Sequence, residues 1–166
     1  GWWFGFGYFL AGLWWIGSAF LVEAYRVAWM MPFAVLAMPV GLALFTAAGT
    51  AFAALFWTDR WSRVLALALF LSLADWVRGH VLTGFPWNLF GYAFSKPLVL
   101  AQSASLIGIY GLSFLAVLIF ALPAVLADHK PLRARLAGLA ASLVLLAGTT
   151  VFGFIRLDLV EDPGFS

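Results

Sequence analysis

Five long apolar stretches follow one another along this chain, and they restrict its fold more than any other feature of the sequence. They cover residues 2–22, 33–57, 64–82, 107–127 and 136–155. About 20 apolar residues in a helix cross the roughly 30 Å hydrocarbon core of a bilayer. Inside that core every backbone polar group needs a partner within the protein, which favours helices. We therefore expect an all-α, polytopic transmembrane helix bundle of about five spans.

The composition leaves little room for a water-soluble domain within the 166 residues. Hydrophobic residues make up 65% of the chain and charged residues 10%, whereas soluble domains are about 45–50% apolar and about 25% charged. The net charge of +2 comes without a run of basic residues, so nothing indicates nucleic-acid binding. The sequence contains no cysteine, which excludes disulfides, thiolate metal sites and a cysteine nucleophile within these residues.

Lysine and arginine in the connections predict the orientation of the bundle. The connections after the second and fourth stretches carry five of them: Arg60, Arg63, Lys130, Arg133 and Arg135. The other side carries four, spread over three segments: Arg26, Arg78, Lys96 and Arg156. Basic residues are enriched in cytoplasmic loops. We therefore expect the connections after the second and fourth stretches in the cytoplasm, and residues 23–32, residues 83–96 and the C-terminal end outside.

The outer end of the third stretch carries an acid and a base, Asp75 and Arg78, three residues apart on one helix face. A charge at the bilayer centre costs about 2.5–3.5 kcal/mol on insertion scales, so it usually has a partner or a function. Two interpretations remain open. Arg78 forms a structural ion pair with Asp75, or its guanidinium binds a lipid phosphate through two parallel hydrogen bonds.

The segment after this helix combines a chain break with aromatic residues. Gly84 and Pro86 end the helix. The aromatic side chains that follow are either a membrane-interface belt or part of a re-entrant loop that lines a lipid-accessible cavity. On the second interpretation the candidate lipid-binding residues are Arg78, Thr83, Phe85, Pro86, Trp87 and Tyr92.

No other residues indicate a catalytic or metal site. His80 and His129 lack a second histidine or a carboxylate at ligand spacing, so we predict no metal. No cofactor is predicted either. The serines near Gly108 and Gly111, where we expect a break before the fourth span, have no base at a recognisable spacing. We therefore assign no catalytic residue in this chain.

Residues 78–92 resemble the apolipoprotein N-acyltransferases of bacterial inner membranes. The similarity lies in Arg78-Gly79, in Leu82-Thr83-Gly84-Phe85-Pro86-Trp87 and in Gly91-Tyr92. Supporting matches are Gly5-Phe6-Gly7 and the run from Gly108 to Phe114. Asp75 and His80 stand where better-known members have Glu and Trp, which leaves the details of the acid pair open.

The resemblance implies a bundle of about eight helices and a nitrilase-like domain outside the membrane. In that domain a Glu-Lys-Cys triad takes an acyl chain from a phospholipid as a thioester. It then passes the chain to the α-amino group of the diacylglyceryl-cysteine of a lipoprotein. We expect this chain to correspond to helices three to seven, with residues 156–166 as a linker toward that domain on the periplasmic side. It would supply lipid binding and scaffold, and would be inactive alone.

Two alternatives remain. One is a membrane module that works with a polyprenyl-phosphate mannosyltransferase. The other is a non-enzymatic scaffold or transport protein, although a transporter would place polar residues along several helices and this sequence has them mainly at Asp75 and Arg78.

Overall fold

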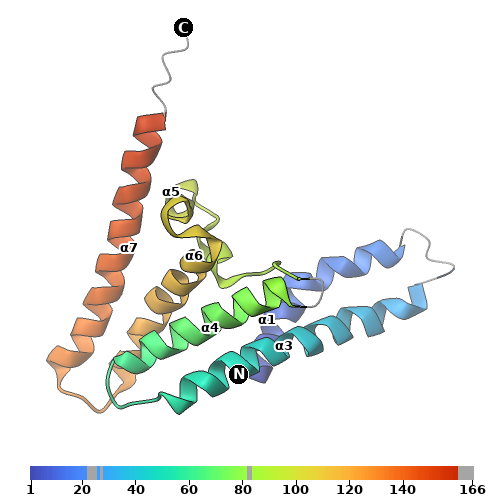
Figure 1. The fold of residues 1–166 in the computed structure, drawn as a ribbon, viewed down its shortest axis with the longest axis horizontal. Helices are drawn as coiled ribbons and strands as arrows, with labels where there is room; N and C mark the ends of the chain where they lie inside the picture. Colours follow the sequence, from blue (N-terminus) through green and yellow to red (C-terminus); the bar gives the residue numbers. More distant parts are fainter. Residues whose placement is uncertain (22–25, 27, 82–83, 161–166) are drawn as a thin grey trace, which may run out of the picture.

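The computed structural model describes residues 1–21, 26, 28–81 and 84–160, and these residues form a helical bundle (Figure 1). The N-terminal pair of long segments is followed by a central helix, a short irregular part and two further long segments. In order, the elements are α1 (Trp2–Leu13), η1 (Trp14–Leu21), η2 (Ala28–Met30), α3 (Met31–Leu55), α4 (Ser62–His80), η3 (Phe90–Phe94), α5 (Leu98–Ala101), α6 (Ala104–Ala121), η4 (Leu122–Ala127) and α7 (Leu132–Val160).

The predicted all-α membrane bundle is confirmed. Four helical segments of the described chain are long and apolar enough to cross a bilayer: Trp2–Leu21, Ala28–Leu55, Ala104–Ala127 and Leu132–Leu159. The remaining predicted span corresponds to α4, which has 19 residues and carries Arg63, Asp75 and Arg78. This helix packs between α3 and α6, so its charged end is enclosed by protein.

Helix α7 extends beyond the apolar stretch that predicts it. α7 starts at Leu132 and continues to Val160, five residues into the segment expected to be a linker. Arg156, in that extension, donates a hydrogen bond to the Ser105 hydroxyl of α6. Apolar residues mark the part of a helix that lies in hydrocarbon, and a helix can continue past that part into the headgroup region.

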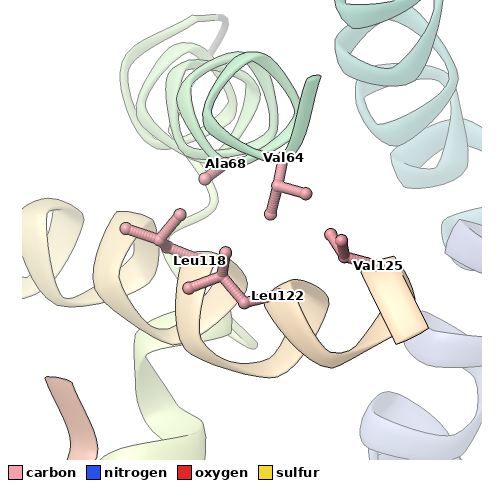
Figure 2. Close-up of a cluster of buried hydrophobic side chains, with 5 residues drawn as sticks. All are labelled: Val64, Ala68, Leu118, Leu122 and Val125. Atoms are coloured by element: carbon pink, nitrogen blue, oxygen red, sulfur yellow. The ribbon is translucent and has the colours of Figure 1, made fainter. Parts of the chain in front are cut away.

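The bundle is built from neighbours in sequence, with α1 against α3, α3 against α4 and α4 against α6. In Figure 1, α7 leans away from these helices, and it contacts mainly η4 and α5. Buried apolar side chains join α4 to α6 and η4 (Figure 2): Val64, Ala68, Leu118, Leu122 and Val125. Many large apolar side chains remain exposed, among them Trp3 at 79% and Leu159 at 76%, as expected where lipid replaces water as the solvent.

One ion pair joins the two connections that the sequence predicts to lie on the same side of the membrane. Arg63, at the start of α4, donates to both carboxylate oxygens of Asp128, which directly follows η4. The structure thus brings these two connections together at one end of the bundle, which is consistent with a shared membrane side.

Gly108 breaks the fourth apolar segment, as predicted. Its φ of +65° and ψ of −180° lie outside the helical region, between the first turn of α6 and the remainder of that helix. A side chain at this φ is strained, although no atom lies near the position of a Cβ. The glycine is therefore required by its backbone conformation and not by packing.

Candidate functional site

The candidate site is centred on the guanidinium of Arg78, which lies in the last turn of α4 and is only 2% exposed. Its Nη2 donates to Asp75 Oδ1 at 2.9 Å. The spacing of three residues places both side chains on the same face of α4. The guanidinium carbon also lies 4.9 Å from the centroid of the Phe9 ring of α1. The charge is therefore enclosed between a carboxylate and an aromatic face.

Arg78 also binds the backbone of the loop that follows α4. Its Nη1 donates to the carbonyl oxygens of Phe85 at 2.7 Å and Trp87 at 2.6 Å. Its Nη2 donates to the carbonyl oxygen of Asn88 at 3.3 Å. These residues are not helical, so their carbonyls lack helix partners, and at membrane depth such groups must be satisfied within the protein. A guanidinium supplies five N–H donors in a fixed plane, which suits this task.

Asp75 completes the same network from the other side. It is 3% exposed, and its Oδ2 accepts a hydrogen bond from the backbone N–H of Phe90 at 2.9 Å. The next amide, Gly91 N–H, donates to Ser113 Oγ of α6 at 2.9 Å. The start of η3 is therefore fastened to α4 by Asp75 and to α6 by Ser113.

The turn out of α4 depends on a glycine. Gly84 has a φ of +73°, a conformation that side chains disfavour. A Cβ at this position would come within 2.6 Å of the Gly79 carbonyl oxygen. The chain returns toward α4 here, and the Phe85 N–H donates to the Arg78 carbonyl oxygen at 2.9 Å. The sequence prediction of a break at this point is thus realised as a loop that folds back over the end of α4.

The contacts of Arg78 favour one of its two interpretations. Both terminal nitrogens of the guanidinium donate to Asp75 and to loop carbonyls, and the side chain is buried. Arg78 therefore does not present its fork at the surface, where a lipid phosphate would lie. The hydrogen bonds instead join the guanidinium to Asp75 and to the backbone of the loop.

The aromatic candidates of the loop separate into an inner and an outer group. Phe85 packs against the buried cluster of Phe9, Leu13 and Leu42 between α1 and α3. Trp87 and Tyr92 are 55% and 43% exposed.

Two contacts hold the rings of Trp87 and Tyr92, which together we call the rim of the loop. Tyr92 O–H donates to the carbonyl oxygen of Pro86, an exposed residue, at 3.2 Å. The Trp87 ring lies edge-on to that of Trp15, with 6.1 Å between centroids. Thr83, the remaining candidate, lies outside the described residues. The loop thus exposes Trp87 and Tyr92, while buried hydrogen bonds to Arg78 and Asp75 hold its backbone.

Sequence reasoning misses the contacts of three residues that complete this arrangement: Ser113, Asn88 and Gly12. The sequence presents Ser113 only as a nucleophile without a base, but its hydroxyl accepts the Gly91 N–H. Asn88 has a φ of 51°, and its side-chain amide occupies the space that a Cβ at Gly12 of α1 would take. The pairing of a glycine in α1 with an asparagine far along the chain leaves no periodic pattern.

Among the described residues, no group of three or more His, Cys, Asp or Glu side chains could hold a metal ion.

Comparison with known proteins identifies the family. Residues 1–122 match the family model for the apolipoprotein N-acyltransferase N-terminal domain. The chain belongs to the apolipoprotein N-acyltransferase family. The resemblance predicted from residues 78–92 is therefore confirmed. The part of the chain that matches the family model includes α1, α3, α4, η3 and α6, which together build the site around Arg78.

Curated proteins with high identity to the chain carry the name apolipoprotein N-acyltransferase. The Rhodopseudomonas palustris protein is 58% identical over 160 residues, which are 96% of this chain and 30% of that protein. The Bradyrhizobium diazoefficiens protein is 57% identical over 161 residues, with the same coverage. The Brucella suis protein is 55% identical over 126 residues, which are 76% of this chain and 24% of that protein. The chain thus spans about 30% of the length of the first two relatives. No solved structure matches it.

Proposed function

We propose that this chain is the membrane part of an enzyme that transfers an acyl chain from a phospholipid to the α-amino group of the N-terminal diacylglyceryl-cysteine of a lipoprotein. Family membership supports the class of reaction. The observation that carries the proposal for this chain is the loop after α4. The buried ion pair of Arg78 and Asp75 is hydrogen-bonded to the loop backbone, while Trp87 and Tyr92 are exposed.

The chemistry and the lipid contacts are divided between two parts of the protein. Acyl transfer through a thioester needs an activated thiolate, and these 166 residues contain no cysteine. The nucleophile and its activating groups would belong to a nitrilase-like domain of the same protein, on the periplasmic side of the bacterial inner membrane. This chain would hold the lipid substrates below that domain, and no residue in it is assigned a catalytic role.

Trp87 and Tyr92 suit contact with both parts of a lipid. Their apolar ring faces can cover acyl chains while the indole N–H and the phenol O–H meet headgroups or water. Phe85 positions this rim through its contacts with the buried cluster between α1 and α3. Pro86 positions it by accepting the hydrogen bond from Tyr92. Arg78 and Asp75 keep the loop backbone in place.

Replacing Trp87 with alanine in the full-length protein tests this function. We expect acyl transfer from labelled phospholipid to a diacylglyceryl-cysteine peptide to fall about tenfold per folded protein, a loss of about 1.4 kcal/mol of transition-state stabilisation. Trp76→Ala is the matched control, because Trp76 is similarly exposed at 46% but lies on α4 and outside the loop. Equal activity of the two variants, whether high or low, would remove Trp87 from the substrate site.

The orientation is a separate proposal. The ion pair between Arg63 and Asp128 puts two Lys/Arg-rich connections at one end of the bundle, and the positive-inside rule assigns that end to the cytoplasm. Ser95 and His129 are both exposed. A membrane-impermeant thiol reagent added to intact spheroplasts should therefore label a Ser95→Cys variant and leave a His129→Cys variant unlabelled. The reverse pattern would invert the topology.

A further inference from the structure

One row of residues along α1 and the start of η1 contacts four consecutive residues of the loop and of η3. The row consists of Phe4, Tyr8, Gly12 and Trp15. Spacings of four and three residues place side chains on one face of a helix. The partners of these residues are, in the same order, Phe90, Leu89, Asn88 and Trp87. The loop therefore runs antiparallel to this row, which we call the α1 row.

The inner end of the α1 row holds the start of η3. The Phe90 ring lies 6.3 Å from the ring of Phe4 and 5.2 Å from the ring of Tyr8. Tyr8 O–H donates to the carbonyl oxygen of Leu89 at 3.4 Å, and Leu89 is buried. This part of the loop is thus in contact with α1 as well as with the ion pair on α4.

The outer end of the α1 row contacts Trp87. The rings of Trp15 and Trp87 lie edge-on, with 6.1 Å between their centroids. The Trp15 indole N–H also donates to the carbonyl oxygen of Gly12 at 3.1 Å. The ring against which Trp87 packs is therefore itself hydrogen-bonded to the α1 row.

The closest contact of the row joins Gly12 to Asn88. A Cβ at Gly12 would overlap the amide nitrogen of Asn88, and it would lie 2.7 Å from Cγ and 3.2 Å from Oδ1. A side chain at position 12 would therefore displace the whole amide group and not only its tip. The backbone of Asn88 resists such a displacement, because its carbonyl oxygen accepts a hydrogen bond from Arg78 at 3.3 Å. Its φ of 51° is one that asparagine tolerates better than most residues.

The α1 row and the ion pair hold the loop in different ways. Arg78 binds backbone carbonyls, including that of Trp87, which fixes the path of the chain. The contacts of Gly12 and Trp15 fix side chains. We propose that Gly12 and Asn88 are positioning residues for acyl transfer, because their close contact keeps the Trp87 ring against Trp15 and in reach of the lipid substrate. This inference rests on the proposed function of Trp87.

Gly12→Ala in the full-length protein tests the contact. Alanine favours a helix over glycine, so a loss of activity would not come from a weaker α1. We expect kcat/KM for acyl transfer to fall by up to about tenfold, the loss expected for Trp87→Ala, because a small displacement of a substrate-positioning group can cost this much. Gly7→Ala is the matched control, because Gly7 is exposed in the same helix and no atom lies within 4 Å of its Cβ position.

A second substitution should rescue the first. Asn88→Gly removes the amide group and still permits the positive φ. Added to Gly12→Ala, it should return kcat/KM to within about twofold of wild type. In lipid nanodiscs, Gly12→Ala should raise the rate of amide exchange in the peptide covering residues 84–91, and adding Asn88→Gly should lower that rate again. This exchange is measured without any assay of acyl transfer.

A double-mutant cycle shows whether Gly12 acts through Trp87. In a Trp87→Ala background, Gly12→Ala should cost less than about a further twofold, because the ring that it displaces is already absent. An equal loss in both backgrounds, or no rescue by Asn88→Gly, would overturn the positioning role. So would wild-type activity and exchange in Gly12→Ala beside a damaged Trp87→Ala, and the proposed function would then stand. A Trp87→Ala variant as active as Trp76→Ala would refute the proposed function and this role with it.

Discussion

Arg78→Ala is expected to lower the free energy of unfolding by about 3–5 kcal/mol, the usual cost of removing one partner from a buried ion pair. Asp75 would remain buried with one oxygen unpaired, and the carbonyls of Phe85, Trp87 and Asn88 would lose their donor. Total stabilities are typically about 5–15 kcal/mol, so much of the protein should fail to fold. Denaturant titration in mixed micelles and the yield of monodisperse protein measure the effect.

Two further substitutions separate the role of the contacts from that of the charge. Arg78→Lys keeps the charge but loses the planar fork, so it should fall between wild type and alanine. Arg133→Ala removes an exposed arginine at the opposite end of the bundle and should stay within about 0.5 kcal/mol of wild type. If Arg78→Ala were as mild as Arg133→Ala, the network around Arg78 would not hold the loop.

Gly91→Ala should be the second most damaging change, at about 1–3 kcal/mol or more. Gly91 is buried, and a Cβ there would lie 2.8 Å from the Ile109 carbonyl oxygen and 2.9 Å from the Ser113 nitrogen. Both are backbone atoms of α6, so η3 would have to move away and break the hydrogen bond from Gly91 N–H to Ser113 Oγ. The same denaturant titration measures the loss.

Gly7→Ala supplies the matched control for this substitution. Gly7 is exposed within α1, and no atom lies within 4 Å of the place that a Cβ would occupy. Alanine favours a helix over glycine by about 1 kcal/mol, so this variant should match or exceed wild-type stability. A similar loss from both glycines would show that close packing of η3 on α6 is not what requires Gly91.

The sequence predicts the helices well because the apolar length needed to cross a bilayer is a simple physical requirement. It also predicts the break at Gly84 and Pro86, and the spacing of Asp75 and Arg78 allows their ion pair. It does not decide between that pair and a lipid phosphate for Arg78. The decision depends on the path of the loop backbone, which brings three carbonyls onto the guanidinium.

Other features escape the sequence for related reasons. The ends of α7 lie outside its apolar stretch, because composition marks the hydrocarbon region and not the last hydrogen-bonded turn. The Ser113 contact with η3 joins segments 22 residues apart and has no local signature.

Hydrogen exchange of the loop amides tests most directly the claim that a buried ion pair fastens this loop. The amides of Phe85, Phe90 and Gly91 donate to the Arg78 carbonyl, to Asp75 and to Ser113. In lipid nanodiscs the peptide covering 84–91 should therefore exchange about as slowly as α4, although it is not helical. Arg78→Lys should raise the rate of amide exchange in this peptide and leave the rate in α3 unchanged. Exchange as fast as in the exposed connection 58–61, or no response to Arg78→Lys, would contradict the account.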